Sequence, residues 1–427
     1  CLKGKIMTSR ERVQMAISLK EPDRVPIDLG GTSVTGISAF SLTGLKKALG
    51  IKTPVMIDEP FQMLGKIDDE LRKILGIDTV ALYARKNLFG FENKNWKKWT
   101  APDGTEFLVP EKFNTTKDDK GNVYLYPEGD TTVLPSGKLP ASGFYFDAII
   151  RQKPIDEANL DPSDNTDLSL LKDEDLRYYE TEATRLYKET EFSIIANFGG
   201  TSFGDIARIP GPFLKNPGGI RDIEEWYVST IIRRNYVYEV FSRQCEIALQ
   251  NLKMISEAVG NKIDVIFVSG TDFGTQNSQF ISVQTYRELY KPFHSKVNGW
   301  IHKNTNWKTF IHSCGSIEPF INDFIEAGFD ILNPIQCSAA NMDPYFLKQK
   351  YGRRICFWGG GIDTQKTLPF GTPEKVKEEV KNRLTIFSKE GGYVFNTIHN
   401  IQAKTPVENI LSMFEAVKQF NNKVEEK

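Results

Sequence analysis

The fold is decided by residues 310–335, which read FIHSCGSIEPFINDFIEAGFDILNPI. A short apolar run, Phe310–His312, is followed by an amphipathic stretch, Ile317–Ala327, and then by a second apolar run, Ile331–Ile335. Short continuous apolar runs are typical of strands that are buried on both faces of a parallel sheet. The stretch therefore predicts a strand, a crossover helix and a second strand parallel to the first.

The same alternation of strand and helix continues along the chain. Eight strands suggest a closed (β/α)₈ barrel, whose active sites lie at the carboxyl ends of the strands. An open doubly wound sheet is the alternative, but no Gly-x-Gly-x-x-Gly fingerprint follows the first strand. The predicted strands are Val25–Gly30, Thr79–Tyr83, Ser193–Phe198, Val265–Ser269, Phe310–His312, Ile331–Ile335, Ile355–Trp358 and Tyr393–Asn396. The predicted helices are Glu59–Leu75, Asp173–Glu189, Glu224–Val259, Val283–Asn304, Ile317–Ala327, Pro344–Tyr351, Pro373–Ser388 and Thr405–Phe420.

One segment, residues 88–147, interrupts this alternation. It is rich in aromatic residues, threonine and turn signals, and Asp103-Gly104 and Lys120-Gly121-Asn122 are typical of hairpin turns. We expect a β-meander inserted near the N-terminal third of the chain, serving as a lid, a docking surface or structural support. The sequence thus predicts one barrel domain over residues 7–427 with a β-rich insertion at 88–147.

Composition excludes several classes of function. Acidic and basic residues nearly cancel, at a net charge of −1 over 427 residues, so neither a nucleic acid nor a membrane surface is an expected partner. No apolar run reaches the roughly 18 residues that a transmembrane helix needs. The residues around Met7 lack the apolar core of a secretory signal. Five cysteines in a chain of this length do not indicate a disulfide framework, so we expect a cytoplasmic protein.

Two histidines and one cysteine stand where predicted strands end. His312 and Cys314 follow the run that begins at Phe310, and His399 follows the last strand, in a chain with only four histidines. Imidazole and thiolate are the usual protein ligands of zinc, and a catalytic zinc takes three of them and keeps a fourth position open. The pattern predicts a zinc site at these three residues. The alternative is that the cysteine is only a small buried hydrophobe.

Other polar residues also follow predicted strands, and we expect them to line the same pocket. The alternative role for Asp272 is to cap its own turn. The alternative role for Asp363 is to cap the helix that follows it. The run Gly359-Gly360-Gly361 is either a flexible turn or an opening for a bulky cofactor or an anionic group. The residues expected to bind and orient a substrate are Asn197, Gln276, Asn333 and Asp363, with Asp272 and His399 as candidate catalytic groups.

The remaining cysteines and histidines are expected to have structural roles. Cys337 is either a fourth metal ligand or, as we favour, an ordinary buried thiol. Cys356 lies inside an apolar strand and is expected in the core. His294 and His302 lie on a predicted helix and are expected at the surface.

Several motifs resemble the uroporphyrinogen decarboxylase superfamily. The resemblance covers nearly the whole chain except the meander, and it implies a (β/α)₈ barrel. The motifs are Met7-Thr8-Ser9-Arg10-Glu11-Arg12-Val13, Asp23-Arg24-Val25-Pro26-Ile27-Asp28, the stretch from His312 to Pro319, Trp358-Gly359-Gly360-Gly361-Ile362-Asp363-Thr364-Gln365, Gly371-Thr372-Pro373-Glu374 and Thr405-Pro406-Val407-Glu408-Asn409.

The two branches of this superfamily differ in their site residues. Decarboxylases grip a tetracarboxylate porphyrinogen with an Arg-rich N-terminal segment, whereas residues 29–36 of this chain contain no arginine. Corrinoid-dependent methyltransferases carry His-x-Cys and a later Cys as zinc ligands, and this chain resembles them at His312 and Cys314. It departs from them at His399, which stands at the position of the later Cys and where decarboxylases place a catalytic His.

The resemblance therefore implies a zinc methyltransferase that moves a methyl group between a small substrate and the cobalt of a corrinoid protein. Gly359, Gly360 and Gly361 would then admit the corrinoid, and the protein would be a monomer or a homodimer. A His₂Cys set gives zinc one fewer negative ligand than HisCys₂, which suits a methoxy or alcohol donor better than a thiol. The alternatives are a porphyrinogen decarboxylase that uses His399 and Asp28, and a non-catalytic binding barrel for a corrinoid or a small molecule.

Overall fold

Seven parallel strands form one sheet whose order follows the chain. The structure is a computed structural model, and it describes residues 7–425. Neighbouring strands pair in parallel throughout, as the sequence predicts. The strands are β3 (Thr79–Leu82), β10 (Ser193–Ala196), β11 (Val265–Ser269), β12 (Lys308–His312), β13 (Ile331–Asn333), β14 (Cys356–Trp358) and β15 (Tyr393–Val394).

A short extended segment, residues 25–28, closes this sheet into a ring. The Asp28 N–H donates to the Phe395 carbonyl at 2.8 Å, and the Phe395 N–H donates to the Pro26 carbonyl at 2.8 Å. On the other side the Asp78 N–H donates to the Ile27 carbonyl at 2.8 Å. The first predicted strand therefore lies between β15 and β3, and the predicted barrel is confirmed.

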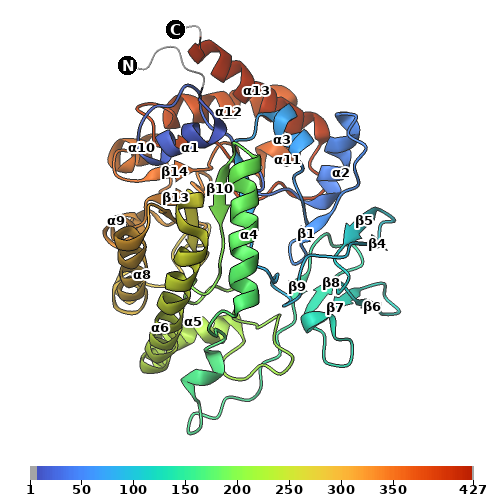
Figure 1. Cartoon of the computed structure of the whole chain (residues 1–427), viewed down its shortest axis with the longest axis vertical. Coiled ribbons are helices and arrows are strands. Elements are labelled where there is room, and N and C mark those ends of the chain that lie inside the picture. The colour runs from blue at the N-terminus through green and yellow to red at the C-terminus, as the bar shows by residue number, and fades with distance from the viewer. Residues whose placement is uncertain (1–6, 426–427) are drawn as a thin grey trace.

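Helices surround the ring, one after each barrel segment (Figure 1). They cover the outward faces of strands that are buried throughout, such as β10 and β11. The surrounding helices are α3 (Asp69–Leu75), α4 (Asp173–Glu189), α6 (Arg234–Val259), α8 (Lys291–Asn304), α9 (Ile321–Glu326), α10 (Pro344–Tyr351), α12 (Pro373–Phe387) and α13 (Val407–Glu425). Further helices are α1 (Ser9–Ile17), α2 (Ala39–Ala48), α5 (Ile223–Ile232), α7 (Val283–Thr285) and α11 (Thr367–Phe370).

The structure corrects three of the predicted helices. The predicted helix Glu59–Leu75 is helical only in α3; its first part belongs to a hairpin of β1 (Ile57–Glu59) and β2 (Leu64–Gly65). Its helix begins at the Asp68 cap, which accepts the Leu71 N–H. The predicted helix Glu224–Val259 is broken at Arg233 between α5 and α6. The predicted helix Val283–Asn304 contains a π-helical turn over Tyr286–Tyr290.

The β-rich segment follows β3 and projects from the side of the barrel (Figure 1). All its strand pairs are antiparallel, in a two-stranded and a four-stranded sheet. Because the segment leaves the barrel at the carboxyl end of a strand, it lies beside the barrel mouth. Its strands are β4 (Lys97–Thr100), β5 (Glu106–Val109), β6 (Thr115–Lys117), β7 (Val123–Leu125), β8 (Gly137–Leu139) and β9 (Asp147–Ala148).

Helix α1 covers the opposite, amino-terminal end of the barrel. It contacts β3, β10 and β15, and its Val13, Ala16 and Ile17 pack with the side chains that fill the barrel interior. Those interior side chains include Phe267 and Trp358, which are no more than 5% exposed. Cys356 belongs to this interior core, as predicted.

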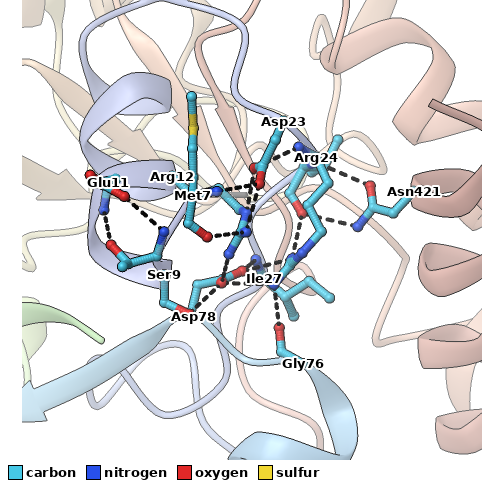
Figure 2. A network of polar contacts seen from close by, with 12 residues as sticks. Met7, Ser9, Glu11, Arg12, Asp23, Arg24, Ile27, Gly76, Asp78 and Asn421 are labelled. Carbon is cyan, nitrogen blue, oxygen red and sulfur yellow. Dashed lines mark hydrogen bonds and ion pairs between the residues drawn. The ribbon is translucent and has the colours of Figure 1, made fainter. Parts of the chain in front are cut away.

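A buried carboxylate, Asp78, fastens α1 and the closing segment to the barrel (Figure 2). It accepts hydrogen bonds from the Arg12 guanidinium at 2.7 Å and from the Arg24 guanidinium at 2.8 and 2.9 Å. The Ser9 hydroxyl and the Ile27 N–H donate to it as well, at 2.7 and 2.9 Å. These residues come from the two N-terminal motifs, whose role here is to close the barrel.

Within residues 7–425, none of the helices is both long enough and apolar enough to cross a membrane.

The surface position predicted for His294 is wrong, since the side chain is fully buried against Phe203 and Phe329. Its helix contacts α6 and α9, and His294 lies on the face that these contacts bury. His302 is exposed, as predicted.

Candidate functional site

A cavity of about 830 Å³ opens at the carboxyl ends of the barrel strands. Tyr83, Asn197, Asp272, His312 and His399 reach it from five different strand ends. The β-rich segment contributes part of the wall, through Phe144, Phe146 and Asp147. This end of a (β/α)₈ barrel is where active sites lie, because its loops vary without disturbing the core.

Three side chains that carry metal-binding atoms lie close together at the cavity, and two of them, His312 and His399, line it. One ligand atom each from His312, Cys314 and His399 lies within 4.8 Å of the others. The Cys314 sulfur is 3.4 Å from His312 Nε2, and the two imidazole rings are 5.2 Å apart at an angle of 70°. Within the described residues this is the one such group of three. The sequence named all three from their places at strand ends.

The orientation of His312 is fixed by its neighbour in the sheet. His312 ends β12 and pairs with Asn333 on β13, so the two side chains lie beside one another. Asn333 Nδ2 donates to the Trp358 carbonyl at 2.8 Å, which leaves Oδ1 to accept from His312 Nδ1 at 2.6 Å. The proton of this imidazole therefore resides on Nδ1. Its Nε2 presents a lone pair to Cys314.

Two tightly packed loops place Cys314. Gly315 has a φ of +88°, and a Cβ there would lie 2.4 Å from the Gly274 backbone, so only glycine fits. This close approach brings Asp272 to the backbone of the other loop, where its carboxylate accepts the Cys314 N–H at 2.7 Å. The same carboxylate is 3.9 Å from His312 Nε2. Asp272 thus holds the His-x-Cys turn rather than capping its own.

His399 has an unusual backbone. Its φ is +69°, a left-handed conformation that costs a non-glycine residue on the order of 1–3 kcal/mol. Neighbouring bonds hold it there: the Thr397 hydroxyl donates to the His399 carbonyl, and Asn400 donates to the Ser33 carbonyl at 3.0 Å. Strain held in place by surrounding contacts is typical of functional sites.

The protonation of the three groups follows from their burial. Burial lowers the pKa of His312 to about 4, and burial followed by the neighbouring His312 lowers the pKa of His399 to about 4. Both imidazoles are therefore neutral near pH 7, the form that binds a metal. Burial and then the Asp272 carboxylate raise the pKa of the Cys314 thiol well above its usual range. A metal ion that binds here would have to release that proton.

The other predicted site residues are divided by the structure. Asn197 and Asp272 line the cavity. Gln276 instead bonds Gln336 and the Ser338 carbonyl, and Asp363 accepts the N–H groups of Gln365 and Lys366, as a cap does. Asn333 lies behind His312. Substrate contact by Gln276, Asn333 and Asp363 stays a prediction.

The glycine run lies against the ends of neighbouring strands. A Cβ on Gly359 would meet the Thr397 carbonyl at 2.9 Å, and one on Gly361 would meet the Phe395 ring at 2.3 Å. The structure thus gives these glycines a packing role, while the binding of a cofactor by them stays a prediction. Cys337 lies outside the group of three, and burial raises the pKa of its thiol to about 12.

Sequence reasoning missed several acidic residues of the cavity. Asp58 and Glu59 line it from β1, a strand that the helical pattern of the region concealed. Asp205 lines it from the loop after β10. The signal for Asp205 was its place behind a glycine-rich strand end, Gly199-Gly200-Thr201-Ser202. No signal in the sequence pointed to Asp58, because hairpin pairing placed it.

The ring, its covering helices and the residues at its mouth define an α/β barrel protein. Residues 218–420 match the family model described as uroporphyrinogen decarboxylase (URO-D). This part of the chain, which holds β11 to β15 and the three metal-binding candidates, is similar to that family, the one that its motifs resemble.

Solved structures agree with this fold. The chain is similar to a methyltransferase from Methanosarcina mazei, with a TM-score of 0.54 and 15% sequence identity over 97% of this chain and 99% of that chain. At this identity the likeness establishes the fold. A search of the curated proteins found no match.

Proposed function

We propose that this protein is a zinc-dependent methyltransferase that moves a methyl group between a small substrate and the cobalt of a corrinoid protein. The observation that carries the proposal is the group of His312, Cys314 and His399 at the mouth of the barrel. The name of the similar structure, a methyltransferase, supports the reaction class.

The donor set fits zinc. Two neutral imidazoles and one thiolate, formed when the Cys314 thiol loses its proton, are typical ligands, and three protein ligands leave a position for a substrate. A zinc ion held there would supply Lewis acidity to an oxygen or sulfur atom of the substrate. Asn333 keeps the Nε2 lone pair of His312 available, and Asp272 holds the turn that carries Cys314. The cavity walls above them would orient the substrate and exclude water.

The lining of the cavity argues against a porphyrinogen decarboxylase. A tetracarboxylate substrate needs cationic partners, yet the cavity is lined by more carboxylates than basic side chains. Asp28, a group that such an enzyme would use, has its oxygens occupied by Thr79, Trp358 and Gly31 at 2.5–2.9 Å. A binding barrel without catalysis would not need a metal-binding group at the floor of the cavity.

Methyl transfer to a reduced cobalamin tests the proposal directly. With a methoxy or alcohol donor, the zinc-loaded protein should form methylcobalamin, seen in the absorbance spectrum, and the chelated protein should not. Thiol methyl donors should react more slowly, because a His₂Cys set leaves zinc the stronger Lewis acid. Reaction with thiols alone would contradict the oxygen-donor assignment, and release of CO₂ from a porphyrinogen would overturn the proposal.

Asn333 should act as a positioning residue for the metal site. Replacing Asn333 by leucine removes the acceptor for His312 Nδ1–H, and should weaken zinc binding by roughly 10–100-fold. Asn333→Asp keeps an acceptor oxygen and should retain most of the affinity. Competition with a chelating indicator measures both values. Equal losses in the two variants would indicate a packing effect instead of an effect on His312.

A further inference from the structure

The cavity carries negative charge that the proposed methyl transfer does not use. Five carboxylates line it, against two basic side chains, Lys86 and Arg208. Lys86 faces Glu128 at 4.0 Å, and the Arg208 guanidinium lies 4.9 Å from the centre of the Phe213 ring. Within residues 7–425, no lysine or arginine forms an ion pair with any of the five. The five carboxylates that line the cavity are Asp58, Glu59, Asp147, Asp205 and Asp272.

Asp58 and Glu59 are adjacent carboxylates that lack a cationic partner in an ion pair. Both Glu59 oxygens are fixed by backbone N–H groups, of Phe61 at 3.3 Å and of Gln62 at 2.7 Å. The Asp58 carboxylate has no hydrogen bond or ion pair to another residue in the described part of the chain. Burial raises the pKa of Asp58 to about 6 and, with the adjacent Asp58 charge, that of Glu59 to about 7. Two neighbouring carboxylates that form no ion pair lower the stability of the folded protein, and a bound cation would remove that cost.

A second observation points to a ligand. Ser38 lines the same cavity and is only 4% exposed, and its hydroxyl has no hydrogen-bond partner among the described residues. A buried hydroxyl without a hydrogen-bond partner is destabilising, and a ligand that bonds it removes that cost. Aromatic side chains also line this cavity, and the faces of aromatic rings attract organic cations. The aromatic lining residues are Phe61, Tyr83, Phe144, Tyr145, Phe146 and Phe267.

The carboxylates suit an organic cation better than an inorganic one. In the described residues, His312, Cys314 and His399 are the one group gathered closely enough to hold a metal ion. The carboxylates are therefore spread along the wall instead of converging on a point. A spread of charge beside aromatic rings matches a molecule with its own apolar body and a charged end.

We propose that the cavity binds a small organic cation, with its ammonium group beside Asp58 and Glu59 and its reacting group at His312, Cys314 and His399. This substrate class rests on the proposed function for the reacting end. The charge selection itself does not depend on the metal, because neither carboxylate belongs to the metal-binding group.

Three probes of one shape and different charge test the proposal. They are 4-methoxybenzylamine, 4-methoxybenzyl alcohol and 4-methoxybenzoate, titrated by calorimetry at pH 7.5 into zinc-loaded and chelated protein. We expect the amine to bind at least 10-fold more tightly than the alcohol, and the benzoate to bind most weakly. The double variant Asp58→Asn with Glu59→Gln should bind amine and alcohol equally. Asp119→Asn, a change in an exposed turn, should leave the preference intact.

The outcomes separate this proposal from the proposed function. A preference for the amine in chelated protein supports charge selection even if zinc or methyl transfer is never found. Equal affinities, a preference for the benzoate, or no binding of the amine at millimolar concentration would each overturn it. So would an amine preference that persists in the double variant.

The unfolding temperature gives an independent reading. A carboxyl whose folded pKa is raised contributes stability below its unfolded pKa and loses it as pH rises through the folded pKa. For Asp58 and Glu59 that window runs from about pH 4 to about pH 7. At pH 8 the ligand-free double variant should therefore melt a few degrees higher than the native protein. At about pH 4 the two proteins should melt at the same temperature. Lys66, Arg72 and Tyr83, the charged and titratable groups nearest the pair, are unchanged in the variant.

Discussion

Cys314→Ala and His312→Ala should each reduce bound zinc from about one ion per chain to almost none. Each change removes one of three ligands, and two protein ligands are too few for a catalytic zinc site. Methyl transfer should then fall by about 10³-fold or more, because the Lewis acid supplies several kcal/mol at about 1.4 kcal/mol per tenfold in rate. Metal analysis by mass spectrometry and the cobalamin assay measure both effects.

Cys337→Ser is the matched control for these variants. Cys337 is also a part-buried thiol after a barrel strand, but it lies outside the metal-binding group. It should keep both zinc and activity. Circular dichroism should show that all three variants are folded. Full zinc content in the Cys314 variant, or none in carefully prepared native protein, would refute the zinc site.

Asp78→Asn should lower the free energy of unfolding by about 3–5 kcal/mol. The carboxylate is completely buried, and two arginines, Arg12 and Arg24, pair with it. Removing its charge leaves two largely buried guanidinium groups, with side chains 6% and 19% exposed, partly unpaired, which is more costly than the ion pairs are worth. Arg12 retains Asp23 as a partner, so Arg24 should carry most of the loss. Urea unfolding followed by circular dichroism measures the change.

An exposed ion pair serves as the control for the Asp78 variant. Glu415 pairs with Lys377 at 2.7 Å, but its side chain is 52% exposed. Glu415→Gln should therefore change stability by less than about 1 kcal/mol. Adding Arg24→Gln to Asp78→Asn should cost less than the sum of the two single changes, since they share one interaction. A loss below 1 kcal/mol for Asp78→Asn would show that the network does not close the barrel.

Much of this protein was determined by local patterns in its sequence. Continuous apolar runs such as Val265–Ser269 predicted buried parallel strands, because each strand must be apolar on both faces wherever helices cover it. The ends of those strands predicted His312, Cys314 and His399, because parallel strands bring their carboxyl ends to one edge. The motifs that contain Arg12 and Arg24 resembled those of a family, but they did not reveal that both arginines bind Asp78.

The tertiary structure decided the rest. Asp78 meets both arginines only when the barrel closes, and Asn333 reaches His312 only through the register of β12 and β13. Asp58 and Glu59 line the cavity because β1 pairs with β2 in a hairpin, in a region where the sequence pattern predicted a helix from Glu59. The hydrophobic periodicity of a segment indicates which of its side chains are buried. It does not indicate which other segment packs against them. The three residues of the candidate metal site were therefore predictable, whereas the residues that support them and the charge of the cavity were not.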